Sequence, residues 1–255
     1  MEVFICENVY VPLRSAPSHK SEMLSQILFG EKYRIVDQIG HWTKVETIFD
    51  NYSGWIDNDH QQFTEDHGDS AGQVLSRSLL CFRSDKTKLV LEAGCEVYVP
   101  DFELKEFYAG KNRYSALSDF SPAYFKVNES FPDTAVRFIN TPYIWGGRIA
   151  SGIDCSGFVQ LVYKIHGVRI PRDSWQQANA GENISFLDGC RAGDLVFFDN
   201  EVGQISHVGM ILSGGSVIHA SGRVRIDTID HHGIFRNEIN AYSHKLRTIR
   251  RIILI

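Results

Sequence analysis

The chain has 255 residues, of which 43% are hydrophobic, 12% aromatic and 22% charged, and this composition is typical of a folded globular protein rather than a disordered one. Its formal net charge is -5, from 26 basic and 31 acidic residues, so the sequence has no broad basic field that would attract nucleic acid. No apolar run approaches the roughly 20 residues that a membrane span requires. We therefore expect neither a nucleic-acid partner nor a membrane span.

The first residues, MEVFICENVYVPLRS, lack the basic start, the long apolar core and the cleavage site of a secretory signal peptide. A cytoplasmic location is predicted if Met1 is the native start. The five cysteines are odd in number, widely scattered and without a CxxC pair, so they predict neither a disulfide framework nor a zinc site. We expect no metal and no cofactor.

Residues 9–57 contain short apolar clusters separated by Gly, Asp, Asn and Ser, which is the pattern of short antiparallel strands joined by turns. Within them, LFGEKYRIVDQIGHWTKVET and the later GWI resemble bacterial SH3-like domains, so residues 1–66 are predicted to form a small β-barrel. The stretch LEAGCEVYVPDFELKEFYAG resembles a weaker copy, and residues 67–127 are predicted to hold a second, divergent SH3-like barrel and a linker that begins near residue 111. The polar segment FTEDHGDSAGQ is predicted to connect the two barrels.

The pattern changes in residues 128–255. PDTAVRFIN is compatible with a short helix, and in DCSGFVQLVYKIHGV apolar residues recur at i, i+3, i+4 and i+7, which predicts an amphipathic helix that ends before Gly167. Three β-branched stretches follow, GDLVFFD, ISHVGMILSGGSVIHASG and LRTIRRIILI, and they predict strands. Helices followed by a meander of strands predict an α+β domain.

Cys155 begins the predicted helix. A thiolate there lies near unpaired backbone amides and the positive end of the helix dipole, so this position favours a nucleophile. Asp154 could cap the helix, and the small Ser156 and Gly157 leave room for a substrate carbonyl. The alternative is a small buried hydrophobic residue, which is what most lone cysteines are.

A cysteine nucleophile needs a base, and the base needs a group that orients it. His207 and His219 lie on two consecutive predicted strands. If the hairpin pairs Gly209 with His219, the two histidines are diagonal neighbours on one face, about 7–8 Å apart. This register requires a bulge or an odd-length loop, because a two- or four-residue loop would send the histidines to opposite faces. Each histidine alone could instead be an ordinary strand residue.

The motifs TPYIWGG, DCSGFVQLVY, GDLVFF, SHVGMIL and IHASG occur in this order and together resemble the NlpC/P60 family of cysteine peptidases across residues 130–255. The resemblance implies an α+β chain with a papain-like NlpC/P60 catalytic domain, preceded by the two small SH3-like β-barrels. It implies Cys155 as nucleophile, His207 as general base and His219 as the residue that orients the imidazole. It also implies that Tyr143 contributes to the oxyanion site.

The same resemblance implies a set of substrate-binding residues. They are Trp145, Asp154, Ser156, Asp173, Ser174 and Ser206 in the third part of the chain, and Glu22 and Tyr52 in the first barrel. Glu22 and Tyr52 are predicted to reach into the active site, where Glu22 would accept a hydrogen bond from the free α-amino group of a peptide.

The whole chain is similar to the γ-D-glutamyl-L-diamino acid endopeptidases of murein peptide recycling. The implied substrate is L-Ala-γ-D-Glu-diamino acid with a free N-terminal L-Ala, and the diamino acid, diaminopimelate or Lys, stays open. One alternative is a cell-wall hydrolase or wall-binding protein that acts on intact peptidoglycan. Another is an acyl transferase of a related fold, in which the histidine usually precedes the cysteine. We expect His231 and His232 to be a solvated loop pair and Cys190 a structural thiol.

Overall fold

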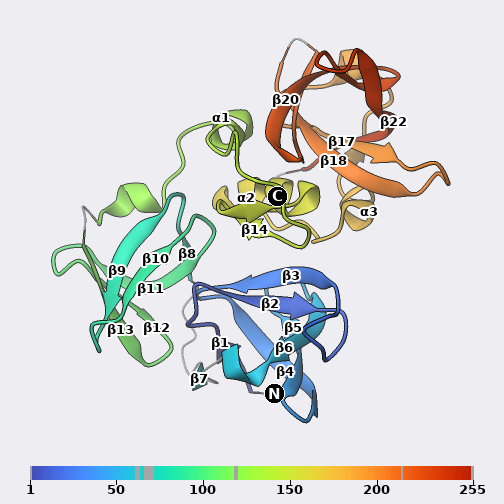
Figure 1. Cartoon of the computed structure of the whole chain (residues 1–255). Helices are drawn as coiled ribbons and strands as arrows, with labels where there is room; N and C mark the ends of the chain where they lie inside the picture. Colours follow the sequence, from blue (N-terminus) through green and yellow to red (C-terminus); the bar gives the residue numbers. More distant parts are fainter. Residues whose placement is uncertain (1, 61–63, 66–71, 118–119, 214, 254–255) are drawn as a thin grey trace. The chain divides into compact units, whose positions relative to one another are not determined.

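The structure is a computed structural model that describes residues 2–60, 64–65, 72–117, 120–213 and 215–253. The chain divides into two compact units, Met1–Val127 and Asn128–Ile255 (Figure 1). Most of the predicted connecting segment FTEDHGDSAGQ lies outside the described residues. Among the helices that the structure describes, none is long and apolar enough to cross a membrane.

The first sheet of unit 1 corresponds to the first predicted barrel. Its strands are β1 (Phe4–Ile5), β2 (Tyr10–Arg14), β3 (Met23–Leu28), β4 (Lys32–Ile39), β5 (Trp42–Thr47), β6 (Ser53–Asp57) and β7 (Thr64–Glu65), paired in the order β3-β2-β6-β5-β4-β1-β7. In β5 the alternate residues Thr43, Val45 and Thr47 are buried, which is the period of a strand with one face in the core. A single-turn 3-10 helix, Asn58–His60, follows β6.

The second sheet of unit 1 has six strands. They are β8 (Gln73–Val74), β9 (Leu79–Arg83), β10 (Lys88–Leu91), β11 (Glu96–Asp101), β12 (Glu106–Ala109) and β13 (Asn112–Ala116), paired in the order β10-β9-β13-β12-β11-β8. Residues 112–116 were expected to be linker, but they form β13 in the middle of this sheet. The two-residue turn before β13 begins at Gly110, whose φ of +54° favours glycine. A 3-10 helix, Pro122–Tyr124, follows.

The two sheets of unit 1 meet along a buried junction. The ring of Phe29 lies edge-on to that of Tyr114 with 5.0 Å between centroids, and the Tyr114 hydroxyl donates a 2.9 Å hydrogen bond to buried Glu7. The Tyr98 hydroxyl donates to the Gly30 carbonyl at 2.8 Å. These contacts join the two sheets into one compact unit.

Unit 2 consists mostly of strands, so the α+β expectation is met only in part. Its elements are α1 (Phe131–Val136), β14 (Arg148–Ile149), β15 (Gly152–Ile153), α2 (Cys155–Ile165), α3 (Ser174–Gln177), β16 (Glu182–Asn183), the 3-10 helix Leu187–Gly189, β17 (Leu195–Asp199), β18 (Ile205–Ile211), β19 (Ser216–Ser221), β20 (Arg223–Asp230), β21 (Gly233–Arg236) and β22 (Ala241–Arg251). Seven strands pair in the order β16-β22-β17-β18-β19-β20-β21, and β21 also pairs with β22. The six strands from β17 to β22 therefore close into a ring (Figure 1).

Helix α2 carries the predicted nucleophile and begins where the sequence predicts. Asp154 is the N-cap residue and accepts a 2.7 Å hydrogen bond from the Gly157 amide, and Gly167 beyond the last turn has a φ of +75°. The amphipathic pattern predicts a helix with one exposed face, whereas all residues of α2 are buried. Even the polar Gln160 lies inside, where it accepts from Arg148 and donates to the Ile170 carbonyl.

The hairpin between β18 and β19 has the register that the sequence analysis required. Gly209 pairs with His219, and Ile211 pairs with Val217. The connection is the odd-length stretch 212–216, within which the Leu212 amide donates to the Ser216 carbonyl at 3.0 Å. The prediction that His207 and His219 share one strand face is therefore confirmed.

Candidate active site

The thiol of Cys155 lies at the start of α2, which packs against β18 and β19. The backbone amides of Val208 and Ser156 hydrogen-bond its sulfur, and the residue is only 6% exposed. Because Val208 follows His207 along β18, the sulfur lies beside the strand that carries the predicted base.

Burial dominates the ionisation of this thiol. Burial, reinforced by the negative charge of Asp154, raises the pKa of Cys155 to about 12, although the Val208 amide and Arg172 act in the opposite direction. The position at a helix start was expected to favour the thiolate, but this effect does not outweigh desolvation in the resting protein. The predicted nucleophilic role of Cys155 would therefore require a base that takes the thiol proton.

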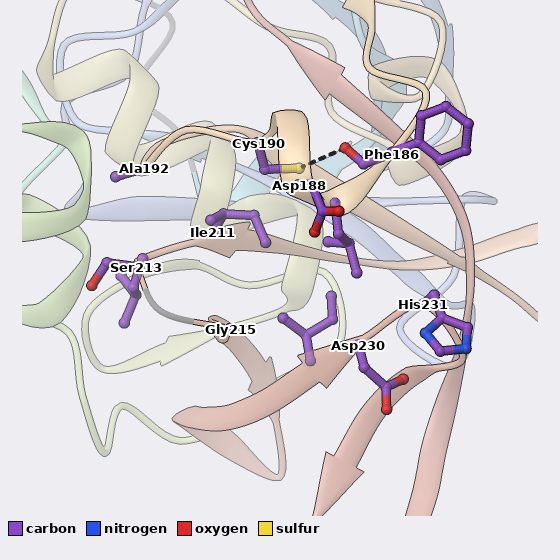
Figure 2. A pocket seen from close by; sticks show the side chains of 12 residues that line it. Phe186, Asp188, Cys190, Ala192, Ile211, Ser213, Gly215, Asp230 and His231 are labelled. Carbon is purple, nitrogen blue, oxygen red and sulfur yellow. Dashed lines mark hydrogen bonds between the residues drawn. The ribbon is translucent and has the colours of Figure 1, made fainter.

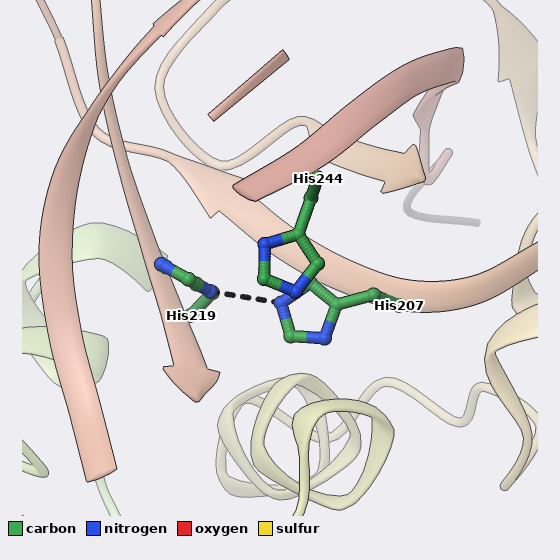
Figure 3. Close-up of side chains that lie close together, drawn as sticks. All are labelled: His207, His219 and His244. Carbon is green, nitrogen blue, oxygen red and sulfur yellow. Dashed lines mark hydrogen bonds between the residues drawn. The ribbon is translucent and has the colours of Figure 1, made fainter. Parts of the chain in front are cut away.

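His207 and His219 form a direct pair (Figure 3). The Nε2 atom of His207 lies 2.8 Å from Nδ1 of His219, and their rings are nearly perpendicular, at 85°. Both side chains are buried. Burial, with contributions from His219 and His244, holds the pKa of His207 well below its ordinary value of 6.5. At neutral pH His207 is therefore an uncharged base.

Three residues that the sequence analysis missed continue this pair. The Nε2 atom of His219 lies 2.9 Å from the Asp227 carboxylate, which Arg225 contacts with two hydrogen bonds of 2.7 and 2.8 Å. Arg225 also donates to Glu238 at 2.9 Å. The available signal was the alternation in VRIDTI, which places Arg225 and Asp227 on one face of the strand after the one that carries His219.

His244 on β22 is a further histidine that the sequence analysis did not select. Its ring stacks on that of His207, with 4.1 Å between centroids and 23° between planes. Burial, and after it His219 and Arg236, lowers the pKa of His244 to about 4. At neutral pH the imidazole of His207 therefore lies against an uncharged ring that restricts its rotation (Figure 3).

Two groups within the described residues bring potential metal ligands together. In the first, His207, His219 and His244, the hydrogen bond between His207 and His219 occupies two of the nitrogens. In the second, Asp230, His231 and His232, the carboxylate already accepts hydrogen bonds from two backbone amides and from a tyrosine hydroxyl. In each group a hydrogen bond therefore already uses a lone pair that a metal ion would need.

Asp154 and Ser156 belong to a buried network centred on Arg172. Arg172 donates to both oxygens of Asp154, at 3.1 and 2.6 Å, and to the Ser156 hydroxyl at 2.8 Å. The Gly146 and Gly157 amides also donate to Asp154, at 2.8 and 2.7 Å. The network fixes the loop before α2 and the first turn of the helix around Cys155. Arg172 is 1% exposed, and the sequence pattern around it does not predict this buried position.

Replacing Arg172 by methionine should destabilise unit 2 by about 3–5 kcal/mol, because the Asp154 carboxylate would lose its cationic partner while staying buried. Urea unfolding followed by circular dichroism measures this change. The matched control is Arg137→Met, which removes the half-exposed 2.7 Å ion pair with Glu129 in the same unit and should cost about 0–1 kcal/mol. Equal losses in the free energy of unfolding for the two variants would contradict the inference that Arg172 stabilises unit 2 more than Arg137 does.

Tyr143 lies close to the thiol. Burial, and after it the nearby Cys155 and Asp154, raises the pKa of its phenol, so the hydroxyl keeps its proton and can donate a hydrogen bond. The chain is held here by a 3.0 Å hydrogen bond from the Tyr143 amide to the Gly222 carbonyl and by a bridge from Tyr143 to Ile153. The placement fits an oxyanion donor, and that role stays a prediction.

The other predicted substrate-binding residues of unit 2 differ in exposure. Trp145 is 59% exposed, and Ser206 is exposed at the start of β18 beside His207. Asp173 precedes α3 and its amide donates to Gln176, whereas Ser174 is buried as the first residue of α3. Their contacts with a substrate stay a prediction.

Glu22 and Tyr52 belong to unit 1. Glu22 is exposed just before β3, and its carbonyl accepts a 2.9 Å hydrogen bond from the Ser15 amide. Tyr52 is half-buried against the core of the first sheet, and its amide donates to the Thr47 hydroxyl at 3.0 Å. Their assigned part in substrate binding stays a prediction.

A cavity of about 630 Å³ opens elsewhere in unit 2 (Figure 2). Apolar residues such as Ile211, Ile229 and Leu187 line it together with Asp188 and Asp230. Among the described residues that line the cavity, none is a predicted catalytic residue. The chemistry of the side chains, rather than this cavity, therefore locates the candidate site.

A buried thiol at a helix start, next to a strand that carries a hydrogen-bonded histidine pair, is the arrangement of a cysteine peptidase. Comparison with known families agrees. Residues 140–242 match the NlpC/P60 family, and residues 13–60 match the bacterial dipeptidyl-peptidase SH3 domain. The chain carries an NlpC/P60 domain preceded by this SH3 domain, as the sequence motifs predicted.

Two relatives resemble most of the chain. The γ-D-glutamyl-L-lysine dipeptidyl-peptidase of Bacillus subtilis (strain 168) is 29% identical over 219 residues, which cover 77% of this chain and 71% of the relative. Dipeptidyl-peptidase 6 of Lysinibacillus sphaericus is 25% identical over 256 residues, which cover 89% of this chain and 92% of the relative.

A solved structure shares the fold along almost the whole chain. It is an NlpC/P60 family protein from Bacillus cereus ATCC 10987, with a TM-score of 0.80 and 20% identity over 98% of this chain and 99% of the other. The similarity extends over both units, so the fold of unit 1 as well as that of the NlpC/P60 domain has a counterpart there.

Proposed function

We propose that this protein is a cysteine endopeptidase that hydrolyses the bond between D-γ-glutamate and an L-diamino acid in murein peptides. The observation that carries the proposal is the buried Cys155 thiol beside β18, whose His207 is hydrogen-bonded to His219 at 2.8 Å. The names of the relatives that resemble both parts of the chain supply the substrate class. We further propose that the second sheet of unit 1 is a divergent SH3-like barrel.

The residues suggest a two-step reaction. His207 accepts the thiol proton as the Cys155 sulfur attacks the γ-carbonyl carbon, and the Tyr143 hydroxyl with nearby backbone amides donates to the oxyanion. The C–N bond then breaks, His207 returns the proton to the departing amine, and a thioester remains on Cys155. Water then attacks the thioester carbonyl while His207 takes a proton from it, the C–S bond breaks, L-Ala-γ-D-Glu leaves with a free γ-carboxyl group, and the proton on His207 returns to the Cys155 sulfur.

The direct test is incubation of the purified protein with L-Ala-γ-D-Glu-L-Lys and with the diaminopimelate analogue, followed by mass spectrometry. Release of L-Ala-γ-D-Glu and the free diamino acid supports the proposal, and the ratio of the two rates gives the preferred diamino acid. Cleavage of intact sacculi with no cleavage of the tripeptides would favour the alternative, a wall hydrolase.

We expect selectivity for a free N-terminal amine. The N-acetylated tripeptide should react at least about tenfold more slowly in kcat/KM than the free tripeptide, because it lacks the cation for a charge-assisted hydrogen bond. In intact wall this amine is bound to muramic acid, so the selectivity would suit recycling of sugar-free fragments in the cytoplasm. Equal kcat/KM values for the two peptides would argue against the selectivity while leaving the bond cleaved unchanged.

A further inference from the structure

The hydrogen-bonded chain behind His207 ends in a carboxylate that has no part in the predicted Cys-His-His set. Asp227 on β20 accepts from Nε2 of His219 at 2.9 Å, and Arg225 holds both of its oxygens. His219, Asp227 and Arg225 are all buried, at 0%, 9% and 8% exposure. In this buried, low-dielectric environment the hydrogen bonds among the three side chains are stronger than they would be in water.

We propose that Asp227, held by Arg225, is a positioning residue that fixes the tautomer of His219 and, through it, the tautomer of His207, so that Nδ1 of His207 accepts the thiol proton. The inference deepens the proposed peptidase function and rests on it for its catalytic consequence.

The proton arrangement follows from the donors and acceptors in order. An ionised carboxylate only accepts hydrogen bonds, so the His219 nitrogen that faces Asp227 must carry hydrogen. Neutral His219 then has an unprotonated Nδ1, and the hydrogen in its 2.8 Å contact with His207 must lie on Nε2 of His207. The remaining nitrogen of His207, Nδ1, is consequently the basic one.

The Asp227 carboxyl group is ionised at neutral pH. Burial alone would raise its pKa, but the hydrogen bonds from His219 and Arg225 outweigh burial and lower the pKa to about 2. Arg225 is anchored in turn by Glu238, which also accepts a 3.0 Å hydrogen bond from Arg236. The carboxylate therefore keeps both its charge and its orientation toward His219.

Without this acceptor, the opposite arrangement becomes accessible. If His219 carries its hydrogen on Nδ1, it donates to Nε2 of His207, and the single hydrogen of neutral His207 moves to Nδ1. A protonated Nδ1 cannot take the proton of Cys155. Since the raised pKa of Cys155 leaves the thiol protonated at rest, attack would then be slow.

The experiment compares Asp227→Leu, which removes the acceptor, with Asp227→Asn, which retains one amide oxygen. We expect kcat for the tripeptide to fall about 100-fold in the leucine variant and about 10-fold in the asparagine variant, with KM changed less than threefold. The matched control is Asp230→Asn, which removes a carboxylate three positions later on the same strand and should leave kcat unchanged. A kcat within twofold of the wild type in both Asp227 variants would overturn the proposal.

Two further measurements use no substrate. NMR of ¹⁵N-labelled imidazoles should give the Nε2–H tautomer for His207 and His219 in the wild type and a mixture in Asp227→Leu. Iodoacetamide should modify Cys155 more slowly in the variants, with the partly exposed Cys190 as internal reference. Unchanged tautomers and rates would overturn the inference even if the wild type cleaves the peptide.

If the wild type cleaves no murein peptide, the proposed function fails, and these two measurements still decide the role of Asp227. If Asp227→Leu does not fold, Asp227→Asn decides.

Discussion

Replacing Cys155 by alanine is expected to lower hydrolysis of L-Ala-γ-D-Glu-L-Lys by about 10⁴- to 10⁶-fold, because no thioester can form without the sulfur. The fold should survive, since alanine leaves the Asp154 cap and the helix that follows it in place. Mass spectrometry of the reaction products measures the loss of hydrolysis, and circular dichroism of the variant shows whether the fold is retained.

The other thiols provide the matched control for this prediction. Cys190→Ala removes the one cysteine that is not fully buried. The variant should keep wild-type activity, because the Cys190 thiol donates to the Phe186 carbonyl at 3.8 Å and the side chain packs against an apolar cluster of unit 2. Cys6 and Cys81 are deeply buried, and desolvation raises the pKa of each. Activity that survives in Cys155→Ala and disappears in Cys190→Ala would reverse the assignment.

The parts of the site that local sequence determines could be predicted. The helix start at Cys155 depends on Asp154 as a cap and on an apolar run, and both can be seen in DCSGFVQLVY. The register that brings His207 and His219 together depends on strand parity and loop length, and both follow from counting residues. Short-range rules were sufficient for these residues.

The parts that depend on long-range packing could not be predicted. Arg172 lies in an irregular segment after α2, and only the tertiary fold brings its guanidinium to the Asp154 carboxylate. Arg225 and Asp227 alternate as residues of any two-faced strand would, so the sequence alone does not say that their face looks toward His219 rather than solvent. His244 is 25 residues from His219 in the sequence, and it reaches His207 because β21 and β22 close the ring.

Strand β13 was missed for a different reason. Its sequence NRYSA holds one large apolar residue, Tyr114, between polar neighbours, which is too short an alternation to stand out from a linker. The burial of Tyr114 against Phe107 on β12 and against Phe29 in the turn after β3 decides the structure there. The strand is therefore a product of packing more than of local preference.

Replacing His207 by alanine is expected to lower kcat by about 10²- to 10⁴-fold, because the thiol, whose pKa burial raises to about 12, would lose the imidazole that accepts its proton in the proposed mechanism. His219→Asn should retain more activity than His207→Ala, since an amide oxygen can still accept the Nε2 hydrogen of His207. Steady-state kinetics with the tripeptide measure both variants. His231→Ala, an exposed histidine of the same unit, is the matched control and should behave as the wild type.

The pH profile of the wild type tests the same assignment independently. His207 must be uncharged to accept the thiol proton, and burial together with His219 and His244 lowers its pKa well below 6.5. The fall of kcat/KM on the acid side should therefore occur as the pH drops through that lowered pKa, and activity should be fully retained between pH 6.5 and 7. In the proposed mechanism His207 is the base and not a metal ligand, so a chelator should leave the profile unchanged. Loss of activity with a chelator, restored by zinc, would mean that the histidines hold a metal, and an acid limb above pH 6.5 would mean that His207 is not the uncharged base that its burial predicts.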